Sequence, residues 1–341
     1  MDSADDPCKC LNRFDLSNAE DQKKIIFRDK HTRIEGLCSE AVFVSDLLAE
    51  SFAEFSSGWW FKPANGSYKI LKLITGLQEI TPLDFKLLRL FAQHAKAAIF
   101  LFKKDCKQCE WALFSPQMET HLAEHWAQHA RPFLPRSRVS APPRPEQRDV
   151  ARLNQAAEFL HARGLLQQAA ISRAFANCWL GDQFILDVDF FVECAGAIYA
   201  FEIKQKFPFR RGPRFAFGLN KGEARLHVFL SQIGVRAINV ILTKPVLHER
   251  ISAIDLYTKI EYRRLSLWLA TAHSDAILQS PQRLAPSKTS IYAGAPVRFY
   301  EMPLSRFHLI KNFGEPKPQA LLDFINGKTS PLPEDFVYPR R

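Results

Sequence analysis

The chain has 341 residues and a formal net charge of +10, with 47% hydrophobic and 24% charged residues, which excludes a disordered or fibrous protein and predicts more than one domain. There is no run of about 18 apolar residues, and the acidic start MDSADDPCKC lacks an apolar segment, so we expect neither a membrane span nor an export signal. The seven cysteines then suit thiols and metal ligands in a reducing compartment, which indicates a cytoplasmic protein, or a nuclear one in a eukaryote.

Residues 1–98 are predicted to form an N-terminal α+β domain. An apolar stretch at 41–55 indicates a helix, and the alternating residues 68–74 indicate a strand. Thr81 can cap a helix that starts at Pro82 and continues to about Lys96. The pattern contains no catalytic constellation.

Residues 99–130 carry thiol and imidazole groups at the spacing of a structural zinc site. Two strands, at 99–103 and 111–114, are expected before a helix that begins at Pro116. The four candidate Zn²⁺ ligands are Cys106, Cys109, His121 and His125. The segment resembles a ββα Cys-Cys-His-His zinc finger, although His125 and His129 could replace His121 and His125. A reduced thiol pair beside a His-rich helix is the alternative.

Two further segments carry no clear chemistry. Residues 131–148 hold five Pro and five Arg, which favours an extended linker whose arginines either contact phosphates or lie in a solvated hinge. Residues 246–341 form a C-terminal extension with an amphipathic, helix-like stretch at 254–269. The N- and C-terminal regions are candidate contact regions for a homodimer or a protein partner.

Residues 149–245 are predicted to form an α/β layered domain. A helix over 150–163 precedes strands near 170–176, 184–192 and 198–204, and a basic loop, a helix over 222–232 and a strand over 237–242 follow. The resulting order is α-β-β-β-α-β, typical of a layered α/β domain of about a hundred residues.

The two central strands bring acidic and basic groups together. With a turn at Ala195-Gly196, Asp189 faces Glu202, and Lys204 lies on the same side because strand side chains alternate. Opposed carboxylates about 5 Å apart repel one another. A divalent cation that accepts oxygen ligands, Mg²⁺ or Mn²⁺, would compensate this repulsion.

Asp189 followed after a turn by Glu202-Ile203-Lys204 resembles the PD-(D/E)xK, or restriction-endonuclease-like, nuclease superfamily over residues 149–245. The resemblance implies that Asp189, Glu202 and the Ile203 carbonyl bind Mg²⁺ and that Lys204 stabilises charge or activates water. Val188 replaces the proline of the family motif, and Asp187 is an alternative to Asp189. Glu158, on the first helix, is a further catalytic candidate, with an ordinary exposed glutamate as the alternative.

The basic excess is concentrated beside this hairpin. Residues 201–250 have a net charge of +7 from ten Lys or Arg and three Glu, which favours a polyanionic partner. The candidate phosphate contacts, interleaved with phenylalanines, are Lys206, Arg210, Arg211, Arg214, Lys221 and Arg225. A solvated basic surface is the alternative.

These patterns predict a Mg²⁺-dependent nuclease that binds nucleic acid, DNA rather than RNA, and cuts it as an endonuclease. The alternative is a catalytically inactive, zinc-dependent nucleic-acid-binding or regulatory protein with a nuclease-like fold. No membrane partner is expected.

Overall fold

The structure is a computed structural model and describes residues 14–104, 109–115, 118–122, 149–176, 185–212, 214–245, 253–273, 277–286 and 296–338. The chain divides into two compact units. The first contains Met1–Ile34 and Ser56–Phe190, and the second contains Glu35–Phe55 and Phe191–Arg341. Both units combine helices with β-strands, which confirms the predicted α/β class. Within the described ranges, no helix is long and apolar enough to cross a bilayer.

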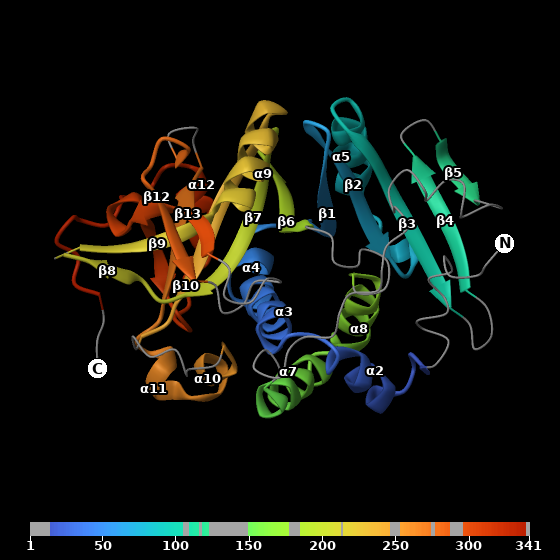
Figure 1. Cartoon of the computed structure of the whole chain (residues 1–341), viewed down its shortest axis with the longest axis horizontal. Helices are drawn as coiled ribbons and strands as arrows, with labels where there is room; N and C mark the ends of the chain where they lie inside the picture. Colours follow the sequence, from blue (N-terminus) through green and yellow to red (C-terminus); the bar gives the residue numbers. More distant parts are fainter. Residues whose placement is uncertain are drawn as a thin grey trace. The chain divides into compact units, whose positions relative to one another are not determined.

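The first unit is built on a mixed sheet with the strand order β6-β1-β2-β3-β4-β5 (Figure 1). β2 runs parallel to β3, and the β1–β2, β3–β4 and β4–β5 pairs are antiparallel. The strands are β1 (Ser56–Ala64), β2 (Ser67–Ile74), β3 (Lys96–Lys104), β4 (Cys109–Ser115), β5 (Met118–Leu122) and β6 (Leu186–Cys194). The boundary between the two units falls inside β6.

The helices of the first unit follow their capping residues. Thr81 caps α5 through a capping box with Asp84, and Pro82 occupies the first turn, as the sequence predicts. Asp149 caps α7 by accepting a hydrogen bond from the Arg152 amide. The helices are α2 (Ala19–Ile26), α5 (Pro82–Ala92), α7 (Val150–His161) and α8 (Leu166–Phe175), with a short 3₁₀ turn η3 (Leu77–Glu79).

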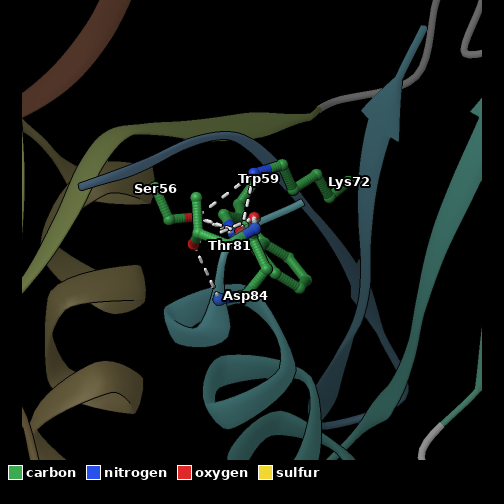
Figure 2. Close-up of polar contacts among 5 residues, drawn as sticks. All are labelled: Ser56, Trp59, Lys72, Thr81 and Asp84. Carbon is green, nitrogen blue, oxygen red and sulfur yellow. Dashed lines mark hydrogen bonds and ion pairs between the residues drawn. The ribbon is translucent and has the colours of Figure 1, made fainter. Parts of the chain in front are cut away.

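A buried polar network joins α5 to the sheet of the first unit (Figure 2). The Lys72 ammonium of β2 lies 2.6 Å from Oδ1 of Asp84, and both side chains are buried. Ser56 donates to the same carboxylate and accepts a 2.7 Å hydrogen bond from the Trp59 indole. Burial lowers the pKa of Lys72, and Asp84 opposes that shift. Every polar group drawn in Figure 2 therefore has a partner, and the network fixes the helix on the sheet.

The second unit contains two sheets, with the strand orders β14-β11-β10-β7 and β12-β13-β9-β8. In the first of these, β10 is parallel to β7 and antiparallel to β11. The strands are β7 (Ala197–Lys206), β8 (Phe209–Arg211), β9 (Arg214–Asn220), β10 (Val235–Thr243), β11 (Leu267–Ala272), β12 (Gln282–Pro286), β13 (Pro296–Pro303) and β14 (His308–Asn312).

Helical segments pack on these sheets. Helix α3 (His31–Phe43) continues as a π-helix η2 (Val44–Leu48) and a short α4 (Ala49–Ser51). The Trp268 ring of β11 lies 5.9 Å from Phe43, and its indole donates to Asp46 at 2.6 Å, which fixes η2 against the sheet. The remaining helices are α9 (Lys221–Gln232), α10 (Ala253–Thr258), α11 (Ile260–Arg263) and α12 (Ala320–Ile325), with a 3₁₀ turn η7 (Leu304–Arg306).

Several predicted elements are wrong in type. The strand expected at 170–176 is instead the end of helix α8, which extends to Phe175, because the buried residues of α8 recur at helical spacing. The stretch 254–269 is not one helix, since α11 ends at Arg263 and β11 begins at Leu267. The basic loop contains the short strand β8 and leads into β9. The order across 149–245 is therefore α-α-β-β-β-β-α-β.

Candidate active site

The predicted central hairpin is present at its predicted turn. β6 ends at Cys194 and β7 begins at Ala197, and the two turn residues have left-handed φ angles of 49° at Ala195 and 78° at Gly196. Two successive positive φ angles are typical of a type I′ turn, whose twist matches that of the flanking strands. Gly196 adopts this conformation without the Cβ strain that Ala195 bears. The turn fixes which side chains of β7 lie on each face.

The two faces of β7 differ in chemistry. Phe201 lies 5.8 Å from the ring of Phe43 and 6.3 Å from that of Phe52, in the apolar layer formed by α3 and α4. Because side chains alternate along a strand, Glu202 and Lys204 project from the opposite face. Glu202 is nevertheless only 3% exposed. A buried carboxylate requires partners that compensate its charge.

Lys204 supplies that compensation and also lies near a second carboxylate, on helix α9. The Lys204 ammonium forms an ion pair with Glu202 and lies 3.8 Å from Oε1 of Glu223, near the start of α9. Burial by itself would raise the pKa of Glu223, but the nearby Lys204, Lys206 and His227 outweigh it and the net shift is downward. Figure 1 shows α9 alongside β7 and β10, so the helix covers the polar face of the strand. The Lys204 side chain as a whole is 30% exposed.

Lys206 is the last residue of β7, and its side chain is held by β9. Its ammonium donates a 2.5 Å hydrogen bond to the carbonyl oxygen of Gly218. Burial lowers the pKa of Lys206, with Glu223 acting in the opposite direction. This predicted phosphate contact thus lies against the acidic pair in the structure.

Two histidines and an asparagine continue the polar cluster beyond Glu223. His227 follows Glu223 by one helical turn, is 4% exposed, and its ring centroid lies 3.9 Å from that of His273. Burial lowers the pKa of His227 to about 4, with Glu223 opposing the shift and Lys204 adding to it. His273 is hydrogen-bonded through Nε2 to the Asn239 amide, and burial holds the pKa of His273 well below its usual range. Both imidazoles are therefore neutral near pH 7.

The register between the parallel strands β7 and β10 places this cluster, through Asn239, on the same face as Glu202 and Lys204. Asn239 of β10 is the Cα partner of Glu202, so both side chains lie on the face covered by α9. The sequence analysis missed Asn239, Glu223, His227 and His273. Two signals could have identified three of them: a single amide inside the apolar run 237–242, and an acid and a histidine four residues apart on the next helix.

The remaining predicted catalytic residues belong to the first unit. Asp189 is buried and Asp187 is exposed on β6, on the other side of the unit boundary from Glu202, so the Asp189–Glu202 pairing stays a prediction. Glu158 on α7 forms a 2.7 Å ion pair with Lys23 of α2, and its side chain is 63% exposed. The hydrogen bond from Lys23 lowers the pKa of Glu158. The contacts of Glu158 thus match those of an exposed helix glutamate.

Two of the candidate phosphate contacts on β8 and β9, Arg210 and Arg214, are exposed. Arg210 donates to the Gly212 carbonyl at 3.0 Å, and Arg214 forms a 2.7 Å ion pair with Glu334. Arg211 is the last residue of β8. On α9, Lys221 is half-buried and Arg225 is exposed. Exposed ion pairs contribute little stability, so these guanidinium groups can exchange partners for a phosphate at small cost.

The predicted zinc finger differs from the structure in its last element. The two expected strands lie within β3 and β4, but residues 118–122 form strand β5 where a helix was expected. His121 is paired with Leu113 across the β4–β5 ladder, and Cys109 is the first residue of β4. The ββα geometry is therefore wrong at His121. Cys106, His125 and His129 lie outside the described residues, and zinc binding stays a prediction.

The acidic pair near Lys204 has the donor chemistry of a hard cation. Within the described part of the chain, no three His, Cys, Asp or Glu side chains are grouped so as to hold a metal ion. Glu202 and Glu223 supply carboxylate oxygens, which are the ligands that Mg²⁺ and Mn²⁺ prefer. Comparisons of the chain with protein-family models, curated proteins and solved structures found no match.

Proposed function

We propose that this chain is a Mg²⁺-dependent nuclease that hydrolyses phosphodiester bonds, with DNA as the preferred substrate and endonucleolytic cutting as its mode. The observation that carries the proposal is the position of Lys204. Its side chain is partly exposed, and its ammonium lies near the carboxylates of both Glu202 and Glu223 on a sheet face covered by α9. A mobile surface salt bridge would not require a carboxylate that is 3% exposed.

The proposal assigns a role to each residue of the hairpin. Asp189, Glu202 and the Ile203 carbonyl would hold the metal, as the hairpin register predicted from the sequence implies. The bound metal would lower the pKa of a water molecule and neutralise charge on the scissile phosphate. Lys204 donates hydrogen bonds to the phosphate oxygens as negative charge develops on them. The proposal includes a restriction-endonuclease-like arrangement of β6, β7, α9 and β10.

Substrate binding is assigned to the basic residues near the site. Arg210, Arg214 and Arg225 are exposed and can contact phosphates along the backbone, which favours a polyanion without selecting its sequence. The carboxylates of the buried Glu202 and the half-buried Glu223 repel a phosphate unless a cation lies between them. Nucleic acid should therefore approach the cluster only when the metal and Lys204 together provide positive charge.

The test is cleavage by the purified full-length protein of plasmid, linear and single-stranded DNA and of RNA, each with Mg²⁺ or with EDTA. We expect Mg²⁺-dependent cutting of DNA that Asp189→Ala, Glu202→Ala and Lys204→Ala each reduce at least a hundredfold while the protein still binds DNA. Glu193→Ala, at an exposed position of the same hairpin, is the matched control and should cleave normally. Full activity in Glu202→Ala would end the assignment. DNA binding without any cutting would favour the alternative of an inactive nucleic-acid-binding protein.

A further inference from the structure

Glu223 is held at the start of α9 by contacts that leave one side of its carboxylate directed at Lys204. Its Oε2 accepts a 3.4 Å hydrogen bond from the Asn220 amide, and Oε1 accepts a 3.2 Å hydrogen bond from the Asn220 side chain. The same Oε1 lies 3.8 Å from the Lys204 ammonium. A capping contact of this kind fixes a side chain to the helix end. Glu223 is therefore a prepositioned second acceptor for Lys204.

The cluster brings two carboxylates, of Glu202 and Glu223, close to two ammonium groups, of Lys204 and Lys206. Lys206 is anchored to the Gly218 carbonyl at 2.5 Å, whereas the Lys204 side chain is 30% exposed and lies near two carboxylates. Lys204 is thus the cation of this cluster that can change its partner.

A divalent cation on Glu202 must compete with the ammonium that now pairs with that carboxylate. Two positive groups cannot share one carboxylate closely without strong repulsion, so metal binding requires Lys204 to move. Displacement toward Glu223 would retain an ion pair that the described part of the cluster already contains.

We propose that Glu223 is a positioning residue that receives the Lys204 ammonium when a divalent cation binds Glu202, and that this exchange sets the affinity for the cation. The inference rests on the proposed function, because it takes Glu202 as a metal ligand. It assigns to α9 the acidic group that the sequence analysis sought in Glu158, which instead pairs with Lys23. Outer-shell partners of this kind typically change metal affinity by about 10- to 100-fold when removed.

The experiment measures Mg²⁺ binding by calorimetry on the full chain without nucleic acid. Mg²⁺ is chosen because it has little affinity for the thiolate and imidazole groups of the predicted zinc segment. The variants are Glu223→Gln, Lys204→Met and the double variant. Glutamine keeps one oxygen that can accept a hydrogen bond from the Asn220 backbone amide and removes the negative charge, at the loss of the second acceptor oxygen. Glu261→Gln, at an exposed position on α11, is the control for loss of one negative charge elsewhere in the unit.

We expect Glu223→Gln to weaken Mg²⁺ binding about tenfold and the control to leave it unchanged. Lys204→Met should tighten binding, because Glu202 loses its competitor, and Glu223→Gln should then have no further effect in that background. An equal loss in both backgrounds would overturn the inference, because Glu223 would then act on the metal directly. Wild-type affinity in Glu223→Gln would overturn it as well.

The two proposals can fail separately. If wild type cleaves DNA with Mg²⁺ while Glu223→Gln binds the cation normally, the nuclease assignment stands and the role of Glu223 is wrong. The opposite outcome is that Glu223→Gln weakens Mg²⁺ binding only when Lys204 is present and Glu202→Ala abolishes it, but no substrate is cut. In that case the movement of Lys204 to Glu223 stands and the nuclease assignment is wrong. Absence of Mg²⁺ binding by wild type overturns both.

Discussion

Replacing His227 with leucine should make the free energy of unfolding depend less on pH below neutrality. The ring is 4% exposed, and its Nδ1 has no hydrogen-bond partner within the described structure, so leucine removes no protein contact at that atom. Burial lowers the pKa of His227 to about 4 from the ordinary 6.5. The unfolded chain therefore binds a proton at a pH where the folded chain does not, and stability falls as the pH drops from about 6.5 to about 4.

The magnitude follows from the pKa difference. With a folded pKa of about 4, the loss between about pH 7 and about pH 5 is about 2 kcal/mol, and it reaches about 3 kcal/mol near pH 4. The groups that face the ring are Glu223, Lys204 and His273. Glu223 opposes the shift and Lys204 reinforces it, so both must stay intact in the comparison.

The assay is urea unfolding followed by circular dichroism near pH 7 and near pH 5. Wild type should lose about 2 kcal/mol more than His227→Leu between the two conditions. Phe229→Leu, on the same helix, changes packing without a titrating group and should lose as much as wild type does. Parallel pH profiles for wild type and His227→Leu would refute the argument, because they would mean that the imidazole is protonated equally in the folded and unfolded chains.

Two further predictions concern the first unit and the zinc segment. Lys72→Met should destabilise the protein by about 3 to 5 kcal/mol, because it leaves the buried Asp84 carboxylate without its cation. The double variant Lys72→Met/Asp84→Asn should recover part of that loss, since it also removes the unpaired charge. Urea unfolding measures the stability of both variants, and an equal loss in the two would contradict the prediction. The chain should contain about one zinc ion by elemental analysis, lost in the Cys106→Ser/Cys109→Ser variant, and a zinc-free wild type of unchanged stability would reject the site.

The sequence determined a turn or a helix start wherever the residues that form it lie within a few positions of one another. The adjacent Ala195 and Gly196 predicted the central turn, and Thr81 followed by Pro82 predicted the start of α5. Capping and turn formation depend on neighbouring backbone groups, so the sequence contains the whole of that information. The same locality explains why the alternation along β7 correctly separated Phe201 from Glu202.

Tertiary structure decided which distant groups meet. The strand expected at 170–176 became helix α8 because burial on one helical face outweighed a short apolar pattern that fits either element. The partners of the Glu202–Lys204 pair come from α9, β10 and the end of β11, so Glu223, Asn239 and His273 converge only when those elements pack. Glu158 was directed to Lys23 by the packing of α7 on α2. The sequence by itself therefore determined the hairpin and its acid–lysine motif, whereas the charges that surround the motif were set by long-range packing, which no local pattern encodes.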